Sequence, residues 1–309
     1  MKLISELKKR LSEQLPAYEI YSEEPLAKHT SFRIGGPAEL MVFPRNMQEL
    51  SKVMQITHEM EIRPYILGGG TNVLAPDAGL RGIVIVTKDA LIGLQLMDAT
   101  HISAMSGMTL AKTAMFAAQD NLSGLEFAHG IPGTVGGGVY MNAGAYGGEI
   151  KDVATKTEFM HPDGTVEMFE GDAQAFSYRS SVFQKLDGVI LRTEFELLPS
   201  KEAEVRSKIK ELADRRRASQ PLELPSAGST FKRPKQGYAA ALIEEAGLKG
   251  LRVGGAAVSE KHAGFVVNQG GATAADVLAL VKLVQKRVFD HCGVLLEPEV
   301  RLWGAEHEN

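Results

Sequence analysis

Two polar residues in the second half of the chain have side chains and neighbours suited to chemistry on an anion. Arg179 lies in a Tyr-Arg-Ser-Ser run, and its planar guanidinium could bind a carboxylate or phosphate through two parallel hydrogen bonds. Ser229 shortly precedes Lys232 and Arg233, and a serine beside cations could donate a proton because its alkoxide is stabilised electrostatically. The ordinary alternatives are a surface salt bridge for Arg179 and a turn or helix cap for Ser229.

Two carboxylates near the C-terminus are a second candidate. Glu297 and Glu299 flank Pro298, and in an extended segment both would point to one face. Such a pair can divide acid and base roles when its surroundings separate the two pKa values, whereas the alternative is that both are solvated. Nucleophilic and metal chemistry are not predicted, because there is no Gly-x-Ser-x-Gly elbow and the single cysteine, Cys292, has no spaced partners. The isolated histidines are expected to be packed or hydrogen-bonded: His29, His129 and His262.

A third feature is a stretch with few side chains. The segment from Gly130 to Gly148, GIPGTVGGGVYMNAGAYGG, holds eight of the 32 glycines of the chain. Glycine permits positive φ and lets backbone N–H groups approach a large anion, which predicts a site for a ligand carrying a diphosphate. A flexible linker is the alternative, but linkers are Ser/Gly mixtures without large apolar residues. The apolar residues that interleave with these glycines are Ile131, Val135, Val139, Tyr140, Met141 and Tyr146.

A second glycine turn, at 68–70, follows an apolar run as a dinucleotide fingerprint would. Val73 takes the place of the third glycine, and a turn from Ala75 to Gly79 stands where that motif requires a helix. Neither glycine cluster is followed by Gly-Lys-Ser/Thr, so a P-loop is also excluded. Two glycine turns that match neither common nucleotide motif indicate a different phosphate-binding fold.

The strands and helices of the fold must position these residues. Predicted strands alternate with predicted helices along the chain, which is typical of an α/β layered domain. Apolar runs predict strands, amphipathic or capped stretches predict helices, and the proline-rich break at 220–225 predicts a domain boundary. The predicted strands are 38–43, 65–67, 83–86, 101–105, 151–160, 165–169, 189–198 and 265–268. The predicted helices are 1–15, one that begins at the capping box 46–49, 109–120, 201–219, 239–246 and 274–291.

Composition restricts the class of protein. A chain of 309 residues with 44% hydrophobic and 23% charged content is globular and long enough for two or three domains. No apolar run approaches the roughly 18 residues of a membrane span, and the N-terminus is typical of an amphipathic helix rather than a signal peptide. The net charge is −4, and the one basic triplet, Arg215–Arg217, is better explained as a helix end than as a nucleic-acid contact. We therefore expect a soluble, cytoplasmic protein with neither a nucleic-acid nor a membrane partner.

Together these motifs resemble one family over nearly the whole chain: the UDP-N-acetylenolpyruvoylglucosamine reductases, the MurB flavoenzymes of peptidoglycan precursor synthesis. Each motif alone is weak, but their order and spacing are specific. The segments that carry the resemblance are 30–36 (TSFRIGG), 67–72 (LGGGTN), 130–137 (GIPGTVGG), 142–147 (NAGAYG), 178–181 (YRSS), 227–232 (AGSTFK) and 296–301 (LEPEVR).

The resemblance implies an α/β (α+β) fold like that of vanillyl-alcohol oxidase, the PCMH-type FAD-binding fold. It implies two FAD-binding subdomains and a C-terminal α/β substrate domain. The first subdomain is at 1–90, where the helix 1–15 precedes its other elements, the second is at 91–220, and the substrate domain is at 221–309. Thr71 stands where some relatives carry a flavin-linking histidine, so we expect noncovalent FAD, with NADPH as the electron donor. The implied FAD-binding residues are Leu67, Gly68, Gly69, Gly70, Thr71, Asn72, Gly130, Ile131, Pro132, Gly133, Thr134, Gly136, Gly137, Asn142, Ala143, Gly144 and Ala145.

The implied reaction has two halves. NADPH passes a hydride to flavin N5, and the enolpyruvyl ether of UDP-N-acetylglucosamine then takes it at the methylene carbon to give UDP-N-acetylmuramate. Negative charge grows on the adjacent carbon and its carboxylate, so a cation and a proton source are needed. Arg179 and Glu299 match the family's pair that stabilises this enolate-like intermediate, and Ser229 matches its proton donor. Lys232 and Arg233 are candidate diphosphate contacts.

We predict no metal site, because Cys292 has no spaced partners and the histidines are isolated, and no obligate protein partner is evident. The short interval 176–188 is similar to the family form that lacks an inserted substrate-covering loop. Two alternatives remain. A flavin oxidase of the same fold, acting on an alcohol or sugar, would react with oxygen and would not need Arg179, Ser229 and Glu299. A degenerate nucleotide-binding module with a regulatory or scaffold role would bind FAD without turnover, and the presence of all three residues argues against it.

Overall fold

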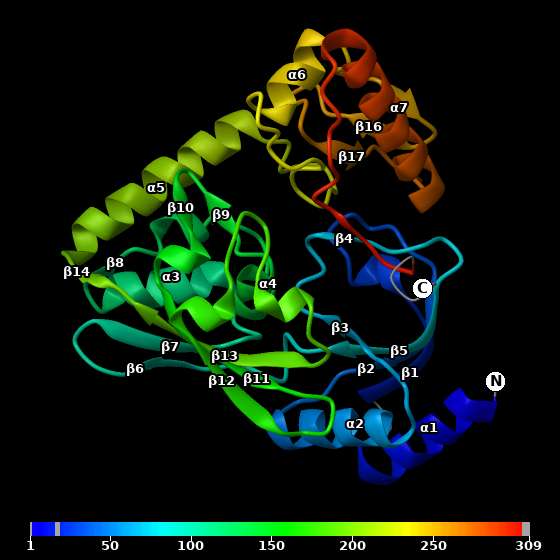
Figure 1. Cartoon of the computed structure of the whole chain (residues 1–309), viewed down its shortest axis with the longest axis vertical. Coiled ribbons are helices and arrows are strands. Elements are labelled where there is room, and N and C mark those ends of the chain that lie inside the picture. The colour runs from blue at the N-terminus through cyan, green and yellow to red at the C-terminus, as the bar shows by residue number, and fades with distance from the viewer. Residues whose placement is uncertain (1, 16–18, 305–309) are drawn as a thin grey trace. The chain divides into compact units, whose positions relative to one another are not determined.

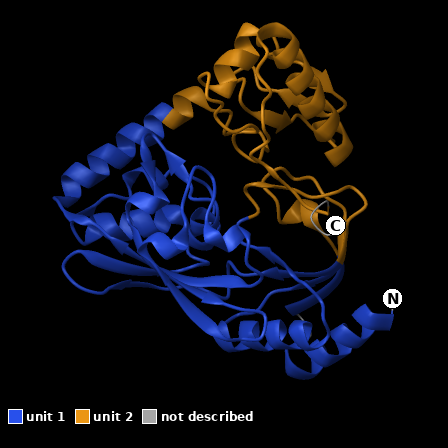
Figure 2. Cartoon of the chain, in the orientation of Figure 1, with its two compact units in different colours: residues 1–23, 39–69, 82–215 blue, residues 24–38, 70–81, 216–309 orange. Residues whose placement is uncertain are grey.

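The computed structural model describes residues 2–15 and 19–304. They form two compact units, each assembled from separate stretches of chain (Figures 1 and 2). Unit 1 comprises residues 1–23, 39–69 and 82–215, and unit 2 comprises residues 24–38, 70–81 and 216–309. Two short N-terminal stretches therefore pack with the C-terminal part of the chain, which no sequence pattern indicated. The three-part division at residues 90 and 220 stays a prediction.

The first sheet of unit 1 has the strand order β1-β2-β5-β3, with β3 and β5 parallel. Its strands are β1 (Ile20–Pro25), β2 (Pro37–Val42), β3 (Tyr65–Leu67) and β5 (Leu80–Val86). The helices α1 (Lys2–Gln14) and α2 (Met47–Glu59) pack together on this sheet (Figure 1). Apolar residues at helical spacing, Leu7 and Leu11 in α1, are fully buried there because the sheet removes them from water.

The second sheet of unit 1 is antiparallel, with the order β12-β11-β13-β7-β6. Its strands are β6 (Leu94–Leu96), β7 (His101–Met105), β11 (Ala154–Met160), β12 (Val166–Glu170) and β13 (Val189–Glu196). The helices α3 (Leu110–Gln119) and α4 (Val135–Tyr140) share a hydrophobic core with it. Met160, Val189 and Leu191 belong instead to the core of the first sheet, so the two sheets are joined by shared apolar packing.

Short elements complete unit 1. The two-residue strands are β8 (Leu122–Ser123) paired with β14 (Leu198–Pro199), and β9 (Gly144–Ala145) paired with β10 (Gly148–Glu149). Within the described residues of unit 1, 3-10 turns lie at Glu126–Ala128, Ile150–Asp152, Gly171–Gln174 and Val182–Gln184, and in unit 2 one lies at Leu26–Lys28.

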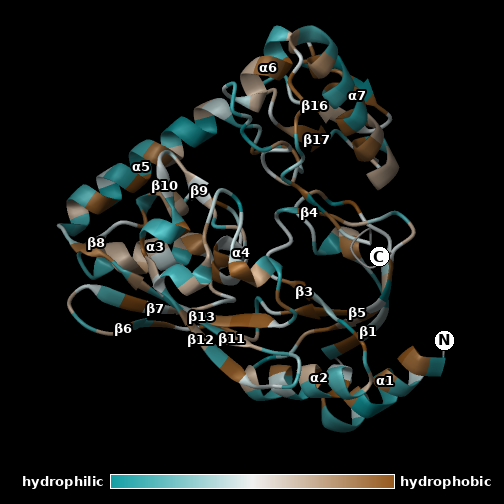
Figure 3. Cartoon of the chain, viewed as in Figure 1, coloured by the Kyte–Doolittle hydropathy of each residue, from teal (hydrophilic) through white to brown (hydrophobic). Residues whose placement is uncertain are grey.

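Helix α5 (Glu202–Ser219) continues from unit 1 into unit 2. It is largely hydrophilic along its length (Figure 3). Acidic residues occupy its first turn, and Arg216 and Arg217 lie in its last turn, where cations favour the helix dipole. The basic triplet therefore closes a helix, as predicted.

Unit 2 has a three-stranded antiparallel sheet, β15 (Arg252–Val253), β16 (Ala256–Val258) and β17 (Val266–Asn268). Helices α6 (Ala239–Glu245) and α7 (Ala274–Cys292) share its core. Helix α7 begins with the predicted capping box of Thr273 and Asp276, and the Asp77 carboxylate accepts from the N–H groups of Ala274 and Ala275 at 2.7 and 3.0 Å. Strand β4 (Val73–Leu74) pairs in parallel with β18 (Arg301–Leu302).

The predicted helices and most predicted strands are present close to their expected bounds. Two differences have physical reasons. The strand expected from 151 starts at Ala154, because Glu149 and Asp152 close a capping box around a 3-10 turn. The glycine segment contains helix α4, which was not predicted since three consecutive glycines are poor helix formers. Among the described helices, none combines the length and apolar character needed to span a bilayer.

Candidate active site and cofactor loops

The glycine segment 130–148 is folded around α4. The Thr134 hydroxyl caps this helix by accepting from the N–H of Gly137 at 3.3 Å. A Cβ on Gly136 would lie 2.8 Å from that of Ser106, so packing requires this glycine. A Cβ on Gly137 would meet nothing closer than the Thr134 hydroxyl oxygen at 3.5 Å, and Gly137 is exposed. Glycine at 137 is therefore not explained by packing, and it leaves bare backbone that a ligand can approach.

The second glycine loop, 67–72, meets the first at Gly68. A Cβ on Gly68 would lie 2.6 Å from Thr134 Oγ1, so a side chain there would displace the hydroxyl that caps α4. The two predicted cofactor loops thus touch within unit 1. Neither 67–72 nor 130–138 contains an acidic residue that would repel a diphosphate. The residues present therefore fit the diphosphate of FAD.

Beyond Gly69 the same loop belongs to unit 2. Gly70 has a φ of 62°, and a Cβ on it would lie 2.0 Å from the main-chain oxygen of His29, so only glycine fits. The N–H of Ser31 donates to the Gly70 oxygen at 3.0 Å. The end of the glycine loop is thus packed against and hydrogen-bonded to the start of the segment 30–36.

Arg179, in unit 1, occupies a tight turn. Reciprocal main-chain hydrogen bonds of 3.0 and 3.1 Å between Ser177 and Ser180 close it. The φ of Arg179 is 56°, a left-handed conformation that costs a residue with a side chain about 1–2 kcal/mol. Its Nη2 donates to the Gly144 main-chain oxygen at 3.1 Å, and its guanidinium carbon lies 4.9 Å from the centre of the Tyr178 ring. The guanidinium is therefore held against the glycine segment.

Asn142 anchors this turn. The side chain is fully buried, and its Nδ2 donates to the Ser177 main-chain oxygen and to Glu149 Oε2, both at 2.9 Å. Its Oδ1 accepts from the Lys151 N–H at 2.9 Å. Because these protein groups already engage the Asn142 amide, the predicted contact of Asn142 with FAD would have to come from its main chain.

Ser229 and Glu299 lie on two paired segments of unit 2. Phe231 and Pro298 form an antiparallel bridge, and the N–H of Glu299 donates to the Thr230 oxygen at 2.8 Å. Ser229 is exposed, whereas Thr230 beside it is buried. The predicted proton donor and the predicted carboxylate are therefore on neighbouring segments.

The two C-terminal carboxylates have different surroundings. Glu297 Oε2 lies 3.3 Å from Lys232 Nζ, and the Glu297 side chain is 72% exposed, whereas Glu299 is half-buried. An exposed pair contributes only about 0–1 kcal/mol, so an incoming diphosphate can compete with Glu297 for Lys232. Arg233 lies over the Tyr238 ring, 4.1 Å from its centre.

The histidines have ordinary environments. Burial lowers the pKa of His129 and of His262 below their usual value. His262 Nδ1 accepts from the Gly264 N–H at 3.2 Å, and its ring packs edge-on against Phe265. His29 pairs with Glu24 at 3.0 Å. Across residues 2–15 and 19–304, no three His, Cys, Asp or Glu side chains are grouped so as to hold a metal ion.

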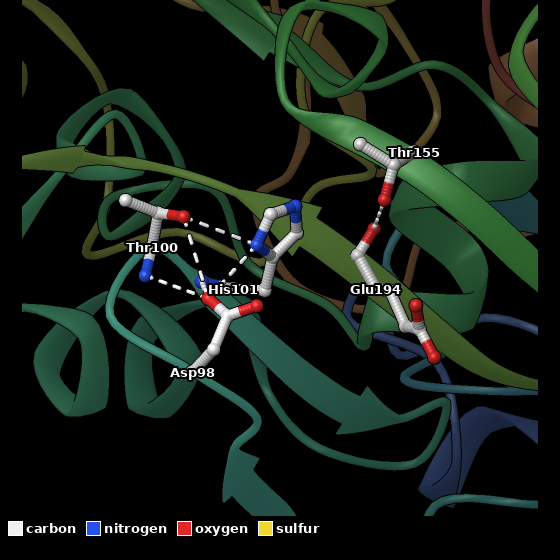
Figure 4. Close-up of polar contacts among 5 residues, drawn as sticks. All are labelled: Asp98, Thr100, His101, Thr155 and Glu194. Carbon is white, nitrogen blue, oxygen red and sulfur yellow. Dashed lines mark hydrogen bonds and ion pairs between the residues drawn. The ribbon is translucent and has the colours of Figure 1, made fainter.

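One polar cluster has the residue types of a catalytic triad without its geometry (Figure 4). Asp98 Oδ1 and Thr100 Oγ1 both contact the same ring atom, His101 Nδ1, at 2.9 and 3.1 Å. A triad places its carboxylate and hydroxyl at opposite ring nitrogens. The Thr100 N–H and the His101 ring lower the pKa of Asp98 to about 2, as expected of an aspartate that closes a turn. Thr155 and Glu194, in the same sheet, are joined by one side-chain to main-chain hydrogen bond of 3.3 Å.

Sequence reasoning missed Gln184. Its Nε2 donates to the main-chain oxygens of Tyr140 and Arg179 at 2.9 and 3.0 Å, which joins the arginine turn to the end of α4. The only local signal was its position just after the Tyr-Arg-Ser-Ser run. Neither periodicity nor spacing predicts a contact between residues 44 apart.

Comparison with protein families shows that the chain contains an FAD-binding domain. Residues 38–169 match the FAD-binding domain family, and residues 220–303 match the C-terminal domain of UDP-N-acetylenolpyruvoylglucosamine reductase. The class of protein is thus an FAD-dependent oxidoreductase.

Relatives along the whole chain identify the family. The chain is 43% identical over 292 residues to the UDP-N-acetylenolpyruvoylglucosamine reductase of Syntrophomonas wolfei, covering 94% of this chain and 97% of that protein. It is 46% identical over 307 residues to the enzyme of Agathobacter rectalis, covering 96% and 98%. The crystal structure of the MurB reductase from Thermus caldophilus matches with a TM-score of 0.77 at 35% identity, covering 92% and 98%. The chain belongs to the UDP-N-acetylenolpyruvoylglucosamine reductase (MurB) family, which confirms the predicted family and fold class.

Proposed function

We propose that this protein reduces UDP-N-acetylglucosamine enolpyruvate to UDP-N-acetylmuramate, with FAD as cofactor and NADPH as electron donor, in the synthesis of peptidoglycan precursors. The observation that carries the proposal is the match of residues 220–303 to the reductase's own C-terminal domain, because an FAD-binding domain alone supports many reactions. The oxidase alternative is not favoured, since relatives along nearly the whole chain are reductases.

FAD bound at the two glycine loops supplies hydride transfer between NADPH and the substrate. The bare backbone at Gly137 and the contact of Gly68 with Thr134 support this placement. Thr71 carries no ring nitrogen to which a flavin could be linked, so we expect FAD to be noncovalent. Acid precipitation should then release the yellow colour into the supernatant, and colour retained in the pellet would contradict this expectation.

The side chains supply binding, charge and a proton. Arg179 holds the substrate carboxylate. As hydride adds to the methylene carbon, negative charge develops on the adjacent carbon and its carboxylate, and Arg179 and Glu299 stabilise this enolate-like intermediate. Ser229 Oγ delivers a proton to the adjacent carbon, which completes the reduction of the double bond. Lys232 and Arg233 bind the diphosphate of the UDP-sugar.

The two half-reactions separate these roles in a stopped-flow experiment. In Ser229→Ala, NADPH should bleach the flavin at the wild-type rate, whereas reoxidation by the enolpyruvyl sugar should slow about 100- to 10,000-fold, as expected when a general acid is lost. The matched control is Ser226→Ala, since Ser226 uses its main-chain oxygen, 2.6 Å from Ser31 Oγ. Normal reoxidation in Ser229→Ala would show that another group supplies the proton. Wild-type flavin that the enolpyruvyl sugar does not reoxidise would refute the proposed reaction.

We also propose that the protein works in the cytoplasm without an obligate protein partner. The purified chain alone should then carry out the complete reaction. A requirement for an added cell fraction would contradict this proposal.

A further inference from the structure

Asn72 ends the second glycine loop beside the segment that carries Glu299. Its Nδ2 donates to the Glu299 main-chain oxygen at 3.2 Å, and the Arg301 N–H donates to the Asn72 main-chain oxygen at 3.0 Å. The parallel pairing of β4 with β18 continues this contact from the next residue, Val73. All of these residues belong to unit 2, so the glycine loop and the C-terminal segment are joined over consecutive residues.

Glu299 is also held from its other side. Its N–H donates to the Thr230 oxygen at 2.8 Å, and Thr230 follows the proposed proton donor, Ser229. Thr230 is itself fixed, because its N–H donates to the Gly264 oxygen at 2.8 Å and its hydroxyl accepts from the Val266 N–H at 2.9 Å. Both main-chain polar groups of Glu299 are thus bound, one by the serine segment and one by the glycine loop.

We propose that Asn72 is a positioning residue for Glu299, so that the loop assigned to the cofactor also sets the place of the carboxylate. The loop is a rigid reference, because Gly70 packs tightly against His29 and accepts a hydrogen bond from Ser31. This inference rests on the proposed function. A single neutral hydrogen bond contributes little to folding, but a misplacement of about 1 Å at a reacting group can slow catalysis about 100-fold. Loss of the Asn72 amide should therefore alter catalysis more than stability.

Gln285 provides a matched control. Its Nε2 donates to the Leu296 main-chain oxygen at 2.8 Å, which is the same kind of bond to the same segment, three residues before Glu299. If Asn72 had only a structural role, Asn72→Ala and Gln285→Ala would have similar effects.

The first experiment measures both half-reactions in the FAD-loaded variants. In Asn72→Ala, flavin reduction by NADPH should stay within about 3-fold of wild type, and reoxidation by the enolpyruvyl sugar should slow about 10- to 100-fold. In Gln285→Ala, both rates should stay within about 2-fold of wild type. Equal slowing of the two half-reactions in Asn72→Ala, or wild-type reoxidation, would overturn the proposal.

The second experiment asks whether Asn72 acts through Glu299. Adding Asn72→Ala to a Glu299→Ala background should slow reoxidation by no more than about 2-fold further, because the side chain that Asn72 positions is already gone. Effects that multiply would show that Asn72 acts independently, and the proposal would fail.

A third readout does not depend on turnover. Hydrogen exchange of the peptide spanning 297–303 should be faster in Asn72→Ala than in wild type, because a segment that has lost the Asn72 anchor opens more often and releases the N–H groups of Glu299 and Arg301. Unchanged exchange in this peptide would overturn the proposal even if Asn72→Ala had lost its FAD. Failure of the proposed function has a different signature, namely wild-type flavin that NADPH reduces and the enolpyruvyl sugar does not reoxidise.

Discussion

The guanidinium of Arg179 donates a hydrogen bond to the main-chain oxygen of Gly144, 3.1 Å away. The residue proposed to hold the substrate carboxylate is therefore fastened to the glycine segment proposed to hold the cofactor. The backbone of Arg179 is left-handed as well, which places an unfavourable conformation beside the proposed chemistry. Stability and activity should accordingly respond in different ways to substitution at this position.

Arg179→Gly tests this separation. Glycine relieves the left-handed strain, which offsets the lost hydrogen bond, so the free energy of unfolding should stay within about 1 kcal/mol of wild type. Reoxidation of the flavin by the enolpyruvyl sugar should fall at least about 100-fold, because the charge that stabilises the developing anion is gone. Urea denaturation and stopped-flow absorbance measure the two effects. A variant that reoxidises its flavin normally would show that Arg179 is not the carboxylate ligand.

Asn142→Ala should be strongly destabilising. It leaves the Ser177 oxygen and the Lys151 N–H without their buried partner, which should reduce the free energy of unfolding by about 2–4 kcal/mol. The control is Asn121→Ala, since Asn121 also has a left-handed φ, of 60°, but its side chain accepts an exposed hydrogen bond from the Glu202 N–H. Subtracting the loss of unfolding free energy in Asn121→Ala from that in Asn142→Ala removes the cost of placing alanine at a left-handed φ. Equal losses in the two variants would mean that the partly buried hydrogen bonds of the Asn142 side chain contribute nothing measurable.

Gly137→Ala should weaken FAD binding without weakening the fold. Position 137 is helical and open, so alanine should leave the stability of the FAD-free protein unchanged or raise it by up to about 1 kcal/mol. A methyl group on the exposed backbone should lower FAD affinity about 10-fold or more if the cofactor approaches there. Gly68→Ala, which displaces Thr134, should reduce both the FAD affinity and the stability of the FAD-free protein. Flavin fluorescence quenching measures the affinity, and undiminished affinity in Gly137→Ala would place the diphosphate elsewhere.

Stability should fall as the pH drops below 7, partly through His262. Burial lowers its pKa in the folded protein, so the unfolded chain binds the proton first, and the contribution present at neutral pH is lost as the pH falls toward the folded-state pKa. Protonation also removes the Nδ1 acceptor of the Gly264 N–H. His262→Gln should reduce the decline in the free energy of unfolding between pH 7 and 5 by about a few tenths of a kcal/mol, since the ring is only partly shielded from solvent. An unchanged slope in urea titrations would exclude His262 as a contributor.

The sequence alone determined the local elements and the family. Helix α7 was predictable because its capping box and apolar spacing involve near neighbours, and the glycine loops were recognisable because bare backbone has a distinct chemical use. The dinucleotide fingerprint could be rejected because Val73 takes the place of its third glycine and a turn follows where the motif requires a helix, and Val73 does lie in strand β4.

Only the tertiary structure decided which distant residues meet. Asn72 contacts Glu299 across 227 positions, and Asn142 contacts Ser177 across 35. A local pattern records which face of an element is apolar, but not which other face will cover it, because that depends on how all the elements pack at once. For the same reason, no local pattern indicated that the segments 24–38 and 70–81 form one compact unit with residues 216–309.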